Sequence, residues 1–107
     1  MEVGPKHSDV RLRVEKGLQA KLVRFSLHGE VRVEERILQA GLVVEDVFKA
    51  LRKGKYIPED DEWSPDLKRW SYAFRHVLVD GEIIKVCVSF LPEDSLVIVV
   101  TVILLNY

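Results

Sequence analysis

The stretch KRWSYAFRHVLVDGEIIKVCVSFL, residues 68–91, decides the fold of this chain. Apolar and polar side chains alternate on both sides of Asp80-Gly81, which is the pattern of two half-buried strands. Asp-Gly is a favoured pair for a two-residue type I′ turn, because both central residues of that turn need positive φ. The sequence therefore predicts an antiparallel hairpin of two strands, 68–79 and 82–91.

A two-residue loop fixes the register of this hairpin. It places Arg75 opposite Val86 on a small, mostly dry face that we expect to pack under helices. The other face would hold His76 opposite Lys85, and Tyr72 in a row of aromatic side chains. We interpret this mixed face either as a surface for RNA, because rings stack on bases and cations meet phosphates, or as a half-exposed sheet or dimer surface.

The regions flanking the hairpin show their own periodicities. The apolar segment 96–105 predicts a central strand covered on both sides, and the acidic, proline-containing segment 57–66 predicts a solvated loop. A short strand at 22–27 is followed by a helix to about residue 40 with Ser26 as its N-cap, and a second helix from Val44 ends at Gly54. Residues 10–22 fit either strands or one helical stripe, and we favour strands.

These elements predict an α+β fold, with two helices packed on one face of a small antiparallel sheet in the order (β)β-α-α-β-β-β. We expect residues 1–9 to form a flexible lead and residues 10–107 to form one domain, which suits a chain of 107 residues.

The amino-acid composition excludes some classes of protein function. An apolar fraction of 48% with 31% charged residues excludes a disordered chain. The net charge of −1 and a pI near 6.3 argue against sequence-blind coating of nucleic acid. The charge is uneven, since residues 1–56 carry 12 basic and 8 acidic groups and residues 57–107 carry 4 and 9. A basic surface on the first half therefore stays compatible with binding of an anionic partner.

A few residue types indicate the cellular compartment of the protein and its thermal stability. Cys87 is the only cysteine, so no intrachain disulfide forms and a reducing, cytoplasmic location is expected. The longest apolar run is ten residues, too short to span a bilayer, so we expect no membrane association. Two glutamines and one asparagine beside many charges favour a thermophilic source.

One cluster of side chains could carry chemistry. His28, Arg32 and Arg36 recur every four residues and would share one helix face. A histidine in the first helical turn is held neutral by the helix dipole, as a general base requires, and two arginines could clamp a phosphate. The alternative is that the interleaved glutamates pair with both arginines. No pattern predicts a metal site or a cofactor, and mid-strand Cys87 is expected to be a packed side chain rather than a nucleophile.

From Phe25 onward the chain resembles a family of small bacterial domains of unknown function. The resemblance rests on Phe25-Ser26-Leu27-His28, on Arg32 and Arg36-Ile37, on Gly41-Leu42, and on the final Val99-Val100-Thr101-Val102. That family is similar to the RelE/ParE toxin superfamily. Two departures are an additional helical turn between His28 and Gly41 and an alanine, Ala40, where an arginine is usual. Either His28 has moved by a turn or Arg32 occupies its place.

The resemblance implies a RelE-like fold and a metal-independent ribonuclease, the toxin of a toxin–antitoxin pair. RNA would be the substrate and an antitoxin the partner. RNA cleavage needs a base, cations on the phosphate and an acid. His28, His76 and Tyr72 are the candidate catalytic residues, and Arg32, Arg36 and Lys85 are the candidate phosphate-binding residues. The competing hypothesis is a non-catalytic module that binds a protein partner or a second copy of itself through the aromatic face or the edge of the strand 68–79.

Overall fold

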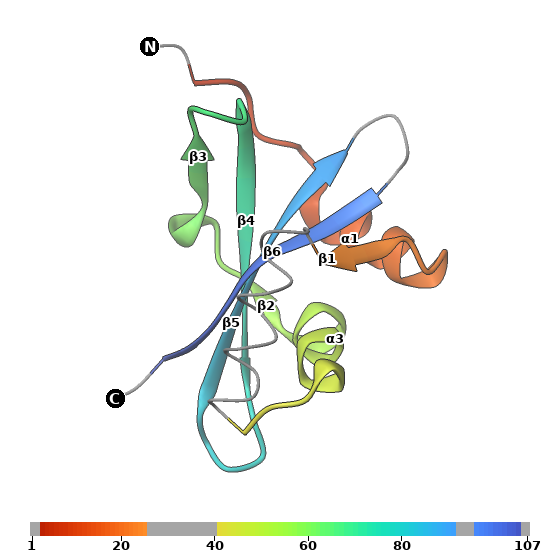
Figure 1. The fold of residues 1–107 in the computed structure, drawn as a ribbon, viewed down its shortest axis with the longest axis vertical. Helices are drawn as coiled ribbons and strands as arrows, with labels where there is room; N and C mark the ends of the chain where they lie inside the picture. Colours follow the sequence, from red (N-terminus) through yellow and green to blue (C-terminus); the bar gives the residue numbers. More distant parts are fainter. Residues whose placement is uncertain (1–2, 26–40, 92–95, 106–107) are drawn as a thin grey trace.

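The computed structural model describes residues 3–25, 41–91 and 96–105 (Figure 1). Over these residues the chain forms α1 (Val10–Gln19), β1 (Val23–Phe25), α3 (Val44–Lys53), β2 (Lys55–Tyr56), the 3₁₀ helix η1 (Pro58–Asp60), β3 (Glu62–Ser64), β4 (Arg69–Val77), β5 (Ile83–Leu91) and β6 (Leu96–Leu105). The predicted α+β class is confirmed.

The strands form one sheet in the order β1-β6-β5-β4-β2, with β3 also paired to β4. The β1 strand runs parallel to β6, whereas all other pairs are antiparallel. The sheet is therefore mixed, not purely antiparallel as predicted. In Figure 1 both described helices, α1 and α3, lie on the same side of the sheet. Side chains from both helices and from that sheet face make up the hydrophobic core.

The segment from Val10 forms a helix, so the preference for strands there was wrong. Val10, Val14 and Gly17 are its buried residues, and their spacing of four and three places them on one stripe. At Gly17 the helix lies so close to β6 that a Cβ atom would stand 2.5 Å from Cγ2 of Val97. Burial against the sheet, with a period of 3.6 residues, overrides the local alternation that favours a strand.

The second predicted helix is confirmed as α3, and the chain leaves it at Gly54. The Asp46 carboxylate accepts the Val43 N–H at 2.9 Å, which satisfies one free donor of the first turn. At the other end, Arg11 of α1 donates to the carbonyls of Leu51 and Arg52 at 2.8 and 2.7 Å. The helix predicted before residue 40, with Ser26 as its N-cap, lies outside the described residues. Neither α1 nor α3 is long and apolar enough to cross a membrane.

The predicted hairpin is confirmed, but its turn is of another kind. Leu78 donates to Glu82 at 2.7 Å and Gly81 donates to Leu78 at 2.9 Å, so three residues form the loop. Gly81 has a φ of +89°, whereas Asp80 is not among the residues with positive φ. This arrangement, a turn followed by a glycine in the left-handed region, replaces the predicted type I′ pair.

The longer loop shifts the register by one residue, which moves each side chain of β4 to the opposite face. Arg75 pairs with Lys85 and Phe74 with Val86. Tyr72 and Phe74 are therefore core residues under the helices, and the predicted aromatic interaction surface does not exist on the outside. Val77, predicted to be in the dry face, is 61% exposed. Arg75, the anomaly of the predicted core, lies on the face away from the helices.

The last strand has the predicted bounds, but its burial differs from the prediction. Only Val97, Val99 and Val102 of β6 are fully buried, and all three belong to the core beneath α1 and α3. The buried residues of β6 thus change from odd to even positions. The cause is a register shift opposite Cys87 and Val88, where Val100 is inserted as an extra residue. Within the described residues, helices cover one face of this strand rather than two.

The segment 57–66 is not simply a solvated loop. It contains η1 and the strand β3, which pairs with β4 through Trp63 opposite Trp70. The two indole rings pack edge to face at 5.8 Å. The acidic side chains of the segment bind the β4 edge, as described below, and this explains why an acidic sequence becomes ordered against the sheet.

Candidate functional site

The predicted site residues do not converge in the described part of the chain. His28, Arg32 and Arg36 lie outside it. His76 pairs with Ile84 on the helix-covered face, as Tyr72 does with Val88. Lys85 lies on the opposite face beside Arg75, so the predicted grouping of His76 with Lys85 was wrong. The one-residue register shift is the physical reason.

Tyr72 is a core residue whose hydroxyl is already engaged. Its side chain is 4% exposed, its ring stacks on Phe90 at 5.1 Å, and its hydroxyl accepts the His7 N–H at 2.7 Å. Burial raises the pKa of Tyr72, while the hydrogen bond from His7 lowers it in part. The hydroxyl is thus kept neutral and tied to the N-terminal segment, and this geometry favours a structural role.

Lys85 belongs to a charge cluster around Asp60. Arg75 binds Oδ2 of Asp60 through Nε at 2.8 Å and through an Nη atom at 2.6 Å, and Nζ of Lys85 lies 4.0 Å from the same oxygen. A carboxylate held by an arginine in this way is already neutralised. This cluster therefore offers less positive charge to a phosphate than its two cations suggest.

The neighbouring Asp61 closes the gap between β2 and β3 on the β4 edge. Its carboxylate is fully buried, accepts the Ala73 N–H at 3.0 Å and the Tyr56 hydroxyl, and pairs with Lys6 at 3.0 Å. Burial, followed by the hydrogen bond to Asp61, raises the pKa of Tyr56. Because Asp61, β2 and β3 occupy this edge, the edge pairing expected of the strand 68–79 is not available along these residues.

His76, one of the predicted catalytic residues, lines a cleft. The cleft has a volume of about 490 Å³ and is bordered by α3, by the residues just before that helix and by the hairpin turn. Its charged and titratable lining residues are Asp46, Lys49, Lys53, His76 and Asp80. Its other lining residues are Gly41, Leu42 and the hairpin residues Val77, Leu78 and Val79.

The lysines of the cleft are available to an anion. Lys49 and Lys53 are exposed, and neither forms an ion pair within the described ranges. The two carboxylates accept backbone N–H groups, Asp46 from Val43 at 2.9 Å and Asp80 from Glu82 at 3.0 Å. An imidazole beside two lysines can bind a phosphodiester and move a proton near it.

Lys49 and Lys53 were not among the predicted site residues. Their spacing of four places them on one face of α3, and this signal was present in the sequence. The sequence did not show which residue lies opposite these lysines, because only the packing of α3 on β4 brings that face of the helix toward His76. This cleft is the candidate functional site.

Cys87 behaves as the sequence suggested. Its side chain is buried among strand residues, and burial, only partly opposed by Lys85, raises its pKa to about 11. A thiol with this pKa is neutral and weakly nucleophilic near neutrality. Among the residues that the structure describes, no three His, Cys, Asp or Glu side chains are grouped as metal ligands.

The N-terminal segment, expected to be a flexible lead, closes a smaller cavity of about 260 Å³ next to two tryptophans. Trp70 Nε1 donates to the Gly4 carbonyl at 2.7 Å, and Nζ of Lys6 lies 4.8 Å from the Trp70 ring centroid. The Nε1 atom of Trp63 is buried and has no hydrogen-bond partner among the described residues. Most polar groups here serve to hold the segment on the sheet.

Comparisons of the chain with protein-family models, with curated proteins and with solved structures found no match.

Proposed function

We propose that this chain is a RelE/ParE-like, toxin-type domain that binds RNA and cleaves it in the cleft of His76. The observation that carries the proposal is that His76 shares this cleft with Lys49 and Lys53, two exposed lysines that form no ion pair with any described residue. The resemblance of roughly residues 22–105 to a RelE-like family supports the same reaction class. In this proposal the protein acts in the cytoplasm and is paired with an antitoxin.

The proposed reaction uses side chains alone. His76 takes the proton of the ribose 2′-hydroxyl, and the 2′-oxygen forms a bond to phosphorus as the bond to the 5′-oxygen breaks. The leaving oxygen takes a proton from water, and the imidazolium returns its proton to the solvent. Lys49 and Lys53 lie against the non-bridging oxygens and stabilise the charge that grows on them. The products are a 2′,3′-cyclic phosphate and a 5′-hydroxyl.

The test is RNA decay measured with purified wild-type protein and three variants. His76→Ala should slow cleavage by about a hundredfold or more, because a general base contributes at least that factor. A Lys49→Ala, Lys53→Ala double variant should raise the RNA concentration needed for half-maximal rate. Lys16→Ala removes one lysine charge from an exposed position of α1 and should leave the rate unchanged.

His28→Ala distinguishes the two histidines that the sequence singles out. If only His28→Ala stops cleavage, the reaction does not occur in the His76 cleft. Equal RNA decay with every variant, or none with the wild type, would refute the proposal.

A second candidate function is self-association, and one specific observation favours it. The face of the sheet away from α1 and α3 carries six partly exposed apolar side chains, which we name the open face: Ile83, Leu91, Leu96, Ile98, Ile103 and Leu105. Within the described ranges β1 pairs only with residues 97–99, so the outer edge of β6 beyond them has no strand partner. This apolar patch, next to an edge that is unpaired within the described ranges, suits a second copy of this chain.

Light scattering tests this second function. The wild type should be a dimer, and an Ile98→Glu, Ile103→Glu variant should be a monomer. Leu12→Glu alters an exposed apolar residue of α1 and should remain dimeric. A monomeric wild type at high protein concentration would argue against the open face as an interface.

A further inference from the structure

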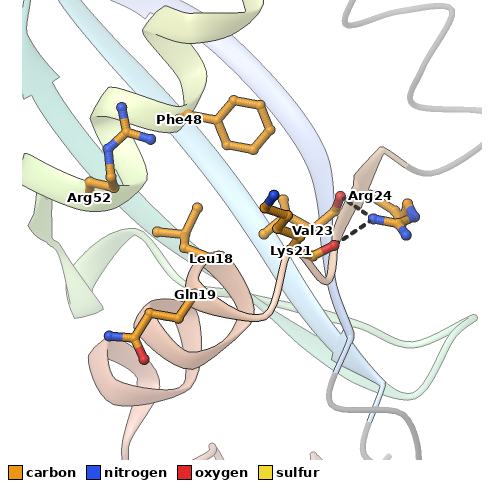
Figure 2. A pocket seen from close by; sticks show the side chains of 7 residues that line it. All are labelled: Leu18, Gln19, Lys21, Val23, Arg24, Phe48 and Arg52. Carbon is orange, nitrogen blue, oxygen red and sulfur yellow. Dashed lines mark hydrogen bonds between the residues drawn. The ribbon is translucent and has the colours of Figure 1, made fainter.

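A third cavity lies between the C-terminal end of α1, the strand β1 and the outer face of α3. Its volume is about 590 Å³, within the range of pockets that hold small organic ligands. Figure 2 shows Leu18, Val23 and Phe48 meeting at its centre, each from a different element. Phe48 is held in place by an edge-to-face contact with Phe25 at 6.4 Å. The floor of the cavity is therefore apolar and supported by the core.

The rim of the same cavity is basic. Lys21, Arg24 and Arg52 line it, and in Figure 2 Arg52 lies on the α3 side while the Arg24 guanidinium lies beyond Val23. One Nη atom of Arg24 donates to the carbonyls of Lys21 and Val23, at 3.0 Å in both cases, so its guanidinium is oriented before any ligand arrives. Arg52 pairs with Glu45, whereas Lys21 and Arg24 form no ion pair in the described part of the chain. The rim thus has an excess of positive charge.

The backbone at Lys21 adds an independent observation. After α1 the chain forms a Schellman-type end, in which Leu22 donates to Gly17 at 2.8 Å and Lys21 donates to Leu18 at 3.2 Å. The residue at this position adopts a left-handed conformation, and Lys21 has a φ of +58°. Glycine is favoured there, and a side chain strains the backbone. This strained position therefore sets an ammonium group at the mouth of an apolar cavity.

We propose that this cavity binds a small amphipathic anion, with an apolar chain or ring on Leu18, Val23 and Phe48 and a carboxylate held by Lys21 and Arg24. Apolar burial supplies affinity and the oriented cations supply the preference for an acid over a neutral analogue. The site is separate from the His76 cleft and does not depend on the function proposed for it.

Octanoate is the probe, with octanol and acetate as analogues that lack the charge and the chain. Titrations followed by ¹H–¹⁵N correlation spectra should shift the amides of residues 17–25 and 48–52. Octanoate should bind about tenfold more tightly than octanol, the effect of one charge-assisted hydrogen bond, and acetate should not saturate. Equal affinity for octanoate and octanol, shifts centred elsewhere, or no saturable binding would overturn the proposal.

Two matched variants separate binding from folding. Lys21→Gly removes the cation and relieves the left-handed strain, so the variant should be at least as stable as the wild type and bind octanoate about tenfold more weakly. Lys68→Gly removes the same charge at the other left-handed lysine, whose φ is +52° and which does not line this cavity. It should bind octanoate like the wild type. If both variants bind equally well, Lys21 does not hold the carboxylate and the proposal fails.

Discussion

Arg75 and Asp60 are joined by two contacts to one oxygen, with Nε at 2.8 Å and an Nη atom at 2.6 Å from Oδ2 of Asp60. The pair links β4 to the 3₁₀ helix η1 on the sheet face away from α1 and α3. It accounts for an arginine in the middle of β4, because the guanidinium holds the preceding acidic segment against the strand.

This geometry predicts that Arg75→Lys is not conservative. A lysine cannot reproduce the two-atom contact, and we expect a loss of about 1 kcal/mol in the free energy of unfolding, since the pair is partly exposed. Urea unfolding measures it. Lys85→Met, which removes the more distant cation at 4.0 Å, should cost less. An equal loss in both variants would contradict the assignment of the pair.

Asp61 should be the most sensitive carboxylate of the acidic segment. Asp61→Ala removes the acceptor for the Ala73 N–H and the Tyr56 hydroxyl, and we expect a loss of about 2–4 kcal/mol in unfolding free energy. Thermal or urea unfolding measures this loss. Glu59→Ala is the control, because Glu59 is exposed and should change stability by about 0.5 kcal/mol at most. Similar values for the two variants would argue against Asp61 as the link across the β4 edge.

Gly54 should not tolerate a side chain. A Cβ atom there would lie 2.2 Å from the Ala50 carbonyl oxygen and 2.7 Å from that of Arg75, and backbone atoms cannot move aside as a flexible side chain can. We expect Gly54→Ala to lower the unfolding free energy by about 2 kcal/mol or more. Gly41→Ala meets no atom of the described residues within 4 Å and carries the strain of a φ of +71°, about 1 kcal/mol. Gly54→Ala should therefore lose more unfolding free energy than Gly41→Ala, and the opposite order would contradict this prediction.

Stability should fall at high pH in a way that depends on Cys87. Its thiol has an ordinary pKa of 9.0 and a pKa of about 11 in the folded protein, so the folded state binds more protons between these values. The free energy of unfolding therefore decreases as pH rises from 9 to 11, by about 2 kcal/mol for this group. Unfolding curves of wild type and Cys87→Ala, compared at pH 8 and pH 11, isolate the effect from other titrating groups. Parallel losses in both proteins would rule it out.

Local patterns in the sequence were sufficient for several elements. The stripe from Val44 to Leu51 and the glycine after it predicted α3, and the apolar run from Leu96 predicted β6 with its observed bounds. In such segments, neighbours along the chain share one face, so periodicity reports burial directly. His76 was likewise singled out from the sequence, and Lys49 and Lys53 could have been found by their spacing of four.

Other features depended on contacts between distant residues. Asp80-Gly81 is compatible with a two-residue or a three-residue loop, and the longer one places the rings of Tyr72 and Phe74 in the core. The stretch from Val10 is compatible with strand or helix, and the close approach of Gly17 to Val97 accompanies the helix.

The candidate site likewise depends partly on local sequence and partly on contacts between distant residues. The sequence alone determined the two hairpin strands, β6 and α3, and it showed which residues carry a titratable or cationic group. Only the tertiary structure decided that His76 faces Lys49 and Lys53 and not Lys85, because one residue of register selects the sheet face and the packing of α3 selects what lies opposite it.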